Sequence, residues 1–175
     1  MTLALTGFMG TGKSTTGKRV ARILRLPFLD TDDEVARRHG PIQTIFQTEG
    51  EPAFRLYEAA VIEELTADPK PCVLAVGGGA VLEARNRARL RGAGLVVHLA
   101  ASPGTILRRV AHRSHRPLLG ARPDIAVIAQ LLEARAFAYA DCDLSVPVDR
   151  KPPSAVAEII ARWYTDIQAR GNVRS

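Results

Sequence analysis

A glycine-rich segment near the N-terminus has the residue types and the spacing of a phosphate-binding loop. Residues 7–14 read GFMGTGKS and fit the pattern G-x-x-x-x-G-K-[ST] at every fixed position. The glycines allow backbone N–H groups to turn toward phosphate oxygens, while Lys13 brings a positive charge to the β- and γ-phosphates. The Ser14 hydroxyl can bind Mg²⁺. These residues predict nucleotide binding with Mg²⁺ and leave the phosphoryl acceptor open.

Two carboxylates, Asp30 and Asp32, follow a short apolar segment at 28–29. Because they are two residues apart, an extended backbone would point both to the same face. One could hold Mg²⁺ through water while the other accepts a proton from a substrate hydroxyl. The alternative is a polar turn that caps the next helix, with Asp33 as the better capping residue. The spacing alone does not separate the two interpretations.

Arg55 lies beside Phe54 at the edge of an apolar stripe with helical spacing. Its guanidinium could hold a ligand carboxylate through two parallel hydrogen bonds. The alternative is a surface ion pair with Glu51 or Glu58, each one helical turn away. Taken alone, the residue favours the ion pair.

Three consecutive glycines, Gly77, Gly78 and Gly79, follow the apolar run at 73–76. A turn needs one glycine or two, so three indicate that a ligand approaches the backbone closely. The alternative is a tight turn from a strand into a helix.

An arginine-rich stretch predicts a mobile lid over about residues 111–123. It could close over the nucleotide and bring an arginine to the transferring phosphoryl group; the alternative is a solvated basic loop. Arg135 lies late in a helix expected over 125–140, at an otherwise apolar position where it requires an anionic partner.

Short apolar runs alternate with helical patterns along the chain, which is typical of strands buried on both faces and the helices that cover them. The runs lie at 3–5, 27–29, 73–76, 95–99 and 144–148. The helical patterns lie around 20–24, 54–65, 106–110, 125–135 and 156–163. The order predicts an α/β fold with a parallel sheet, helices on both faces, and ligands at the carboxyl ends of the strands.

The absence of two other motifs narrows the function. The sequence contains no N-K-x-D, with which a GTPase would read its base. The run at 73–76 ends in glycines instead of the aspartate that motor and transport ATPases place there. A small-molecule kinase remains.

Composition predicts one domain over the 175 residues, with 46% apolar and 24% charged residues. The two cysteines, the lack of a long apolar run and the lack of a basic leader predict a reduced cytoplasmic protein without a membrane span. The net charge of +6 suggests anionic partners, but 5% aromatic residues argue against a nucleic-acid interface. Arg85, Arg87, Arg89 and Arg91 are expected on a solvated helix surface.

The ordered set of segments resembles the shikimate kinase family of nucleoside-monophosphate-kinase-like P-loop proteins. The resemblance rests on residues 7–15, 28–32, 45–58, 77–81 and 116–119, followed by Arg135 and the Tyr139–Asp143 region. It implies a three-layer fold with a five-stranded parallel sheet in the order 2-3-1-4-5. It also implies Mg-ATP-dependent phosphorylation of the shikimate 3-hydroxyl, giving shikimate 3-phosphate and ADP on the way to chorismate and the aromatic amino acids.

The resemblance also implies a role for each candidate residue. Asp32 would bind shikimate hydroxyls and act as the base, assisted at the transferring phosphate by Lys13 and Arg116. Ser14 would bind Mg²⁺, and Asp30 would bind it through water. The shikimate pocket would comprise Asp32, Arg55, Gly77, Gly78, Gly79 and Arg135, with shikimate-side helices over about 33–65. The ATP site would comprise Gly10, Thr11, Gly12, Lys13, Ser14, Thr15, Arg116 and Arg109, the last stacked on adenine.

The chain departs from the family at Gly40-Pro41-Ile42, where a serine or threonine usually precedes the isoleucine. The alternatives are a gluconate-type kinase and a non-catalytic kinase-like module that binds a ligand. The glycine triplet, residues 116–119 and Arg55 weigh against the first, and the presence of Lys13 and Asp32 weighs against the second. We expect a monomer that acts on shikimate and ATP and binds neither nucleic acid nor membrane.

Overall fold

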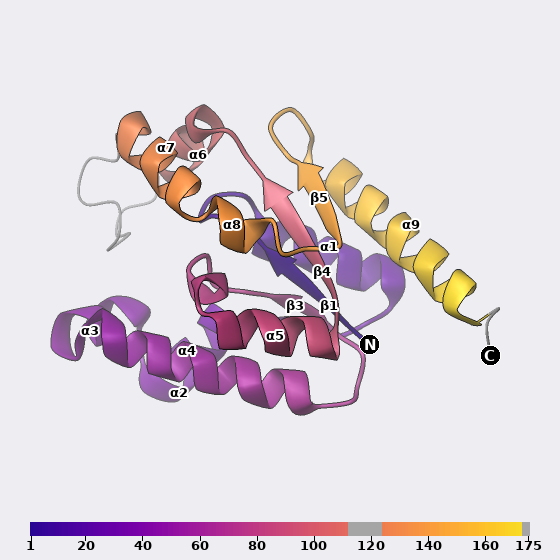
Figure 1. Cartoon of the computed structure of the whole chain (residues 1–175), viewed down its shortest axis with the longest axis horizontal. Coiled ribbons are helices and arrows are strands. Elements are labelled where there is room, and N and C mark those ends of the chain that lie inside the picture. The colour runs from indigo at the N-terminus through magenta and orange to yellow at the C-terminus, as the bar shows by residue number, and fades with distance from the viewer. Residues whose placement is uncertain (112–123, 173–175) are drawn as a thin grey trace.

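Five parallel strands form the centre of the computed structural model, which describes residues 1–111 and 124–172 (Figure 1). The strand order is β2-β3-β1-β4-β5. The strands are β1 (Thr2–Thr6), β2 (Phe28–Asp30), β3 (Val73–Ala75), β4 (Gly94–Ala100) and β5 (Leu144–Pro147). The predicted fold class and strand order are confirmed.

Helices cover both faces of the sheet (Figure 1). They are α1 (Lys13–Leu24), α2 (Thr31–His39), α3 (Ile42–Thr48), α4 (Gly50–Ala67), α5 (Ala84–Ala93), α6 (Pro103–Val110), α7 (Ile125–Ala134), α8 (Ala136–Tyr139) and α9 (Pro153–Asn172). A 3₁₀ turn, η1 (Ala80–Leu82), precedes α5. No helix in the described ranges is long and apolar enough to span a membrane.

Alternation along β1 divides the core into two layers, because successive strand residues face opposite sides of the sheet. Leu3 and Leu5 pack in one cluster with residues of α1 and α9, including Val20 and Ile160. Ala4 belongs to a second cluster, with residues from α4 to α8. All five β1 residues are buried, as expected of a central parallel strand.

Helices α2, α3 and α4 share a third apolar cluster of their own. Val35, Ile45, Phe54 and Val61 form its buried part. Pro41 does not disturb this region, because it is the N-cap of α3 and its carbonyl accepts a hydrogen bond from the Ile45 N–H at 3.1 Å. The departure from the family pattern is therefore compatible with a regular helix.

The region around Asp32 differs from the extended segment expected from spacing. Asp30 ends β2 and is the N-cap of α2, so Asp32 already lies in the first turn of that helix. Asp33 is not the cap. Asp30 is the cap because its carboxylate accepts a hydrogen bond from the Asp32 N–H, one of the N–H groups that have no partner within the helix at its start.

The helix expected over 125–140 is also wrong as a single element. It divides at Arg135, which is the C-cap of α7 and precedes α8. By contrast, α6 begins at a regular cap, since the Ser102 hydroxyl accepts a hydrogen bond from the Thr105 N–H and Pro103 follows the cap.

The arginines of α5 are less solvated than expected. Arg87 and Arg89 have side chains only 18% and 17% exposed, and they form ion pairs with Asp141 and Glu63. Arg85 is exposed, as expected. Some of the arginines of α5 therefore form ion pairs that join this helix to neighbouring elements.

Residues 112–123 lie outside the described residues, and with them Arg116 and all but the first residue of the predicted lid. The assignment of residues 1–175 to a single kinase domain stays a prediction.

Candidate active site

The phosphate loop connects the carboxyl end of β1 to the N-terminus of α1. Gly10 and Gly12 have φ angles of 80° and 94°, which other residue types rarely adopt. Gly12 is the N-cap of α1, so unpaired N–H groups of the first helical turn face the loop. Lys13 Nζ donates hydrogen bonds to the carbonyl oxygens of Gly7 at 2.8 Å and Phe8 at 3.2 Å. N–H donors and an ammonium group thus gather where a phosphate chain could bind.

Two predicted nucleotide-binding residues, Thr11 and Arg109, hold the loop in place. The buried Thr11 hydroxyl donates a hydrogen bond to the Phe8 carbonyl at 2.8 Å. Arg109 Nη1 donates to the carbonyls of Gly10 and Thr11, both at 3.2 Å, and Nη2 donates to the Val148 carbonyl at 3.1 Å. Arg109 therefore joins the phosphate loop to the segment after β5, and its stacking on adenine stays a prediction.

Asp30 places a carboxylate between the phosphate loop and α2. Its Oδ2 accepts a hydrogen bond from the Ser14 hydroxyl at 2.6 Å, and its Oδ1 accepts one from the Asp32 N–H at 3.0 Å. Hydroxyl and carboxylate oxygens are ligands that Mg²⁺ prefers, so this pair fits the predicted metal. Over 1–111 and 124–172, no three His, Cys, Asp or Glu side chains gather as a metal site. Nucleotide phosphates and water would have to complete the coordination.

A cavity of about 300 Å³ lies beside the loop and brings most of the predicted nucleotide and catalytic residues together. It is lined by Met9, Gly10, Gly12, Lys13, Ser14, Thr15, Asp30, Asp32, Val76, Gly78, Arg108 and Arg109. The candidate base Asp32 therefore shares one cavity with the candidate phosphate ligands, as an in-line transfer requires.

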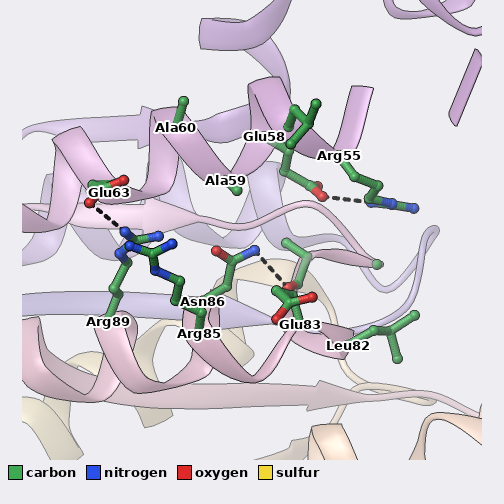
Figure 2. A pocket seen from close by; sticks show the side chains of 13 residues that line it. Arg55, Glu58, Ala59, Ala60, Glu63, Leu82, Glu83, Arg85, Asn86 and Arg89 are labelled. Atoms are coloured by element: carbon green, nitrogen blue, oxygen red, sulfur yellow. Dashed lines mark hydrogen bonds and ion pairs between the residues drawn. The ribbon is translucent and has the colours of Figure 1, made fainter. Parts of the chain in front are cut away.

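Arg55 forms both of the ion pairs considered as its alternative role, but one of them is buried. Nη2 lies 2.9 Å from Glu51. Nη1 lies 2.6 Å from Glu58, and Figure 2 shows this second pair. Glu58 is only 1% exposed, and this burial raises the pKa of its carboxyl to about 7. Arg55 thus lies between an exposed and a buried carboxylate, at the boundary of the site.

The glycine triplet connects the two halves of the site. A Cβ atom on Gly77 would collide with the carboxylates of Glu58 and Asp32, and one on Gly79 would lie 2.5 Å from Arg55 Nη2. A Cβ on Gly78 would lie 3.2 Å from the Met9 nitrogen in the phosphate loop. The triplet therefore permits a close approach by three different neighbours, which a turn alone does not need.

Arg135 lies at the junction of α7 and α8, where it is 7% exposed. Its guanidinium stacks 5.2 Å from the centre of the Phe8 ring. Nη1 is buried without a hydrogen-bond partner among the described residues. A buried cation with an unused donor favours an anionic ligand. The neighbouring Tyr139 hydroxyl donates to the Gly78 carbonyl at 2.8 Å, which joins this junction to the glycine triplet.

Glu58 and Tyr139 were not among the predicted site residues. Glu58 lies one turn from Phe54 and from Ile62 on the buried side of α4. A carboxylate at an apolar stripe position is a sequence signal that could have found it. Tyr139 left no comparable signal, because an aromatic residue at a helical spacing is ordinary core.

His98 on β4 makes the free energy of unfolding depend on pH. It stacks on Tyr139 with ring centres 4.7 Å apart, and burial, aided by the charge of Lys13, lowers its pKa to about 4. Between pH 6.5 and 4 the unfolded chain therefore binds a proton that the folded chain rejects. We expect the free energy of unfolding to fall by about 2 kcal/mol over this range because of His98.

Urea unfolding at several pH values measures this loss. A His98→Gln variant should show a shallower acid limb, whereas His39→Gln, on an exposed histidine stacked on Tyr57, should keep the slope of the parent. Equal slopes in the parent and His98→Gln would contradict the assignment.

Comparisons with known proteins identify the chain's relatives. The shikimate kinase family model matches residues 9–165. A shikimate kinase of Thioalkalivibrio sulfidiphilus is 44% identical over 164 residues, which cover 93% of this chain and 86% of the relative. The chain belongs to the shikimate kinase family. It is accordingly an ATP-dependent kinase with an alcohol acceptor.

Solved structures agree with the family. Shikimate kinase from Acinetobacter baumannii in complex with shikimate superposes with a TM-score of 0.89 at 35% identity, covering 94% of this chain and 93% of that one. A gluconokinase from Sinorhizobium meliloti superposes with a TM-score of 0.68 at 19% identity, covering 99% and 97%. The second likeness shows the fold alone. The recognition of the shikimate kinase family from ordered motifs is thus confirmed, while the roles of single residues stay predictions.

Proposed function

We propose that the chain transfers the γ-phosphoryl group of ATP to the 3-hydroxyl of shikimate, giving shikimate 3-phosphate and ADP. The observation that carries the proposal is the glycine triplet. It lies against the phosphate loop on one side and against Asp32, Glu58 and Arg55 on the other. A phosphoryl donor site and a site for a hydroxylated carboxylate thus share one stretch of backbone.

Asp32 acts as the base in this proposal. The acceptor oxygen attacks the γ-phosphorus, the bond from that phosphorus to the β,γ-bridging oxygen breaks, and Asp32 takes the hydroxyl proton. Its place in the first turn of α2 fixes the carboxylate beside the phosphate loop. Lys13 holds the phosphates at that loop, and Arg116 is proposed as a further phosphate contact.

Arg55 and Arg135 bind the shikimate carboxylate. Arg135 offers a buried guanidinium with an unused donor, and Arg55 offers a guanidinium directed at Gly79. Both are cations that match a small acid better than a neutral sugar. This charge match favours a small hydroxylated carboxylate, the class to which shikimate belongs, and supports Gly77, Gly78 and Gly79 as the floor of its pocket.

Ser14 and Asp30 hold Mg²⁺, Ser14 directly and Asp30 through water. Mg²⁺ held there together with ATP would supply positive charge beside the phosphate oxygens. The remaining ATP contacts are assigned to backbone and side chains of Gly10, Thr11, Gly12, Lys13, Ser14 and Thr15, with Arg109 on adenine.

We further propose that the protein is a cytoplasmic monomer in the pathway to chorismate and the aromatic amino acids. Its two free cysteines suit a reducing compartment.

A coupled assay of ADP release tests the function. With Mg-ATP, shikimate should support turnover and gluconate should not. Turnover with gluconate alone would contradict the proposal, and the appearance of shikimate 3-phosphate by mass spectrometry would identify the product.

Gly77→Ala should abolish most of the activity. A Cβ atom there would lie 2.8 Å from Asp32 Oδ1 and closer still to Glu58 Oε1, so both carboxylates would have to move. A displacement of this size in a transfer site costs about 100-fold in rate. Steady-state kinetics with shikimate and a fold check by circular dichroism measure it.

Gly92→Ala is the matched control, because a Cβ at Gly92 meets nothing within 4 Å. That variant should retain full activity and gain about 0.5 kcal/mol of helix stability. Full activity in Gly77→Ala would remove the triplet from the acceptor site.

A further inference from the structure

Glu58 is a buried carboxylate to which the reaction above gives no task. It lies on the buried side of α4, 1% exposed, and its Oε2 accepts a hydrogen bond from Arg55 Nη1 at 2.6 Å. Its other oxygen, Oε1, is buried without a hydrogen-bond partner among the described residues. A carboxylate in this state is satisfied on one side only, so its charge depends on the positive charge of Arg55.

Arg55 already forms hydrogen bonds with two carboxylates before any acceptor binds. Glu51 accepts hydrogen bonds from Nε at 3.2 Å and from Nη2 at 2.9 Å, while Glu58 occupies Nη1. A guanidinium has five N–H donors, so further donors remain for a substrate. However, Arg55 has one positive charge, which cannot balance the negative charges of several carboxylates. Even if Arg135 shares the acceptor carboxylate, that carboxylate would be a third anion around Arg55.

The other charged groups near Glu58 do not remove this conflict. Asp32 on α2 is negative and opposes the charge of Glu58, whereas Lys13 on α1 is positive but is also assigned to phosphate. Across from α4 lie Glu83, Arg85 and Arg89, the last of them paired with Glu63. Among these groups, Arg55 forms an ion pair with Glu58, with Nη1 2.6 Å from Glu58 Oε2. Burial already raises the pKa of Glu58 to about 7, so one more nearby negative charge decides its protonation.

We propose that Glu58 takes up a proton from solvent when the acceptor carboxylate binds to Arg55, so that this guanidinium is released from the buried carboxylate to the substrate. The inference rests on the proposed function, because it takes the acceptor to be a carboxylate held by Arg55. The proton binds to a Glu58 oxygen, and no other bond changes. Glu58 is in this sense a positioning residue, because its protonation determines how strongly Arg55 attracts the substrate carboxylate.

A water-accessible cavity gives the proton a path to Glu58. Between α4 and the η1–α5 segment lies a cavity of about 630 Å³, and Arg55, Glu58 and Asn86 are among its lining residues (Figure 2). It shares no lining residue with the cavity at the phosphate loop. The proton can therefore reach Glu58 without passing through the site of phosphoryl transfer.

Proton uptake makes acceptor affinity depend on pH in a defined direction. Above pH 7 Glu58 is mostly charged in the free protein, so binding requires a proton whose concentration falls as pH rises. The dissociation constant for shikimate should then increase about tenfold per pH unit above pH 7. The increase ends where Glu58 no longer binds the proton in the complex. ATP affinity should not follow this dependence.

Isothermal titration calorimetry of shikimate into the whole chain at pH 8 tests the proposal. Titrations in phosphate and in Tris, which differ strongly in ionisation enthalpy, should give heats that correspond to nearly one proton taken up per shikimate bound. Glu58→Gln should still bind shikimate, with the same heat in both buffers and a dissociation constant that does not change with pH. Glu51→Gln, with the other Arg55 partner neutralised, should keep the uptake.

Two results would overturn the proposal: binding of shikimate by the parent chain without uptake, or undiminished uptake in Glu58→Gln. Should Glu58→Gln fail to fold, the buffer dependence of the parent and its KM for shikimate from pH 6.5 to 8.5 decide alone. A KM that is constant over this range contradicts the inference. Failure of the proposed function looks different, since shikimate would then give neither binding heat nor turnover.

Discussion

Lys13→Ala should lower kcat by about 1,000-fold or more with any acceptor, because a fixed positive charge at the transferring phosphate stabilises the transition state far more than the bound ground state. Lys13 is already directed over the loop, where it donates to the Gly7 and Phe8 carbonyls. Steady-state kinetics with Mg-ATP and shikimate measure the loss, and titration with ATP separates it from binding.

Lys18→Ala is the control for this variant. Lys18 lies on the same helix and is exposed, with Nζ 5.6 Å from the centre of the Phe28 ring. Its loss should leave kcat within twofold of the parent, since an exposed cation–π contact contributes about 0.5–1 kcal/mol to stability and nothing to transfer. A fall in kcat of less than tenfold in Lys13→Ala would mean that another cation serves the transferring phosphate.

Asp32→Asn should lower kcat by about 100- to 10,000-fold, the range expected when a general base is lost. ATP affinity should change little, because the amide retains the size and the helix position of the carboxylate. The split between an affected kcat and an unaffected ATP dissociation constant is the signature of a group that acts on the acceptor. Rapid-quench measurement of the transfer step shows the loss directly.

Asp33→Asn provides the neighbouring control, since Asp33 is exposed and does not line the cavity at the phosphate loop. It should retain parental kcat. Comparable losses in both variants would point to damage to α2, and parental activity in Asp32→Asn would assign the base to a different group.

Local patterns predicted the parts of the fold and the site in which neighbours in sequence act together. The phosphate loop is such a part, because strand, glycines, lysine and helix start follow one another without interruption. Strand order could not be obtained in this way, since β1 pairs with β3 and β4, which lie far along the chain. It came from the resemblance to the family.

Long-range contacts explain the residues that sequence reasoning placed wrongly. The apolar spacing on both sides of Arg135 does not reveal the helix break there. The feature that marks this position is the contact of Arg135 with Phe8, which lies 127 residues earlier in the sequence. Glu58 was considered only as a surface partner of Arg55. Its burial depends on the packing of α4 against the glycine triplet, which no helical spacing reveals.

Asp30 limits which residues evolution can accept at the end of β2. One of its oxygens caps α2 and the other reaches Ser14. Asparagine would keep a cap but lose the charge, and glutamate would keep the charge but place it one methylene too far from the Asp32 N–H. Only aspartate meets both demands, so the position should tolerate no substitution.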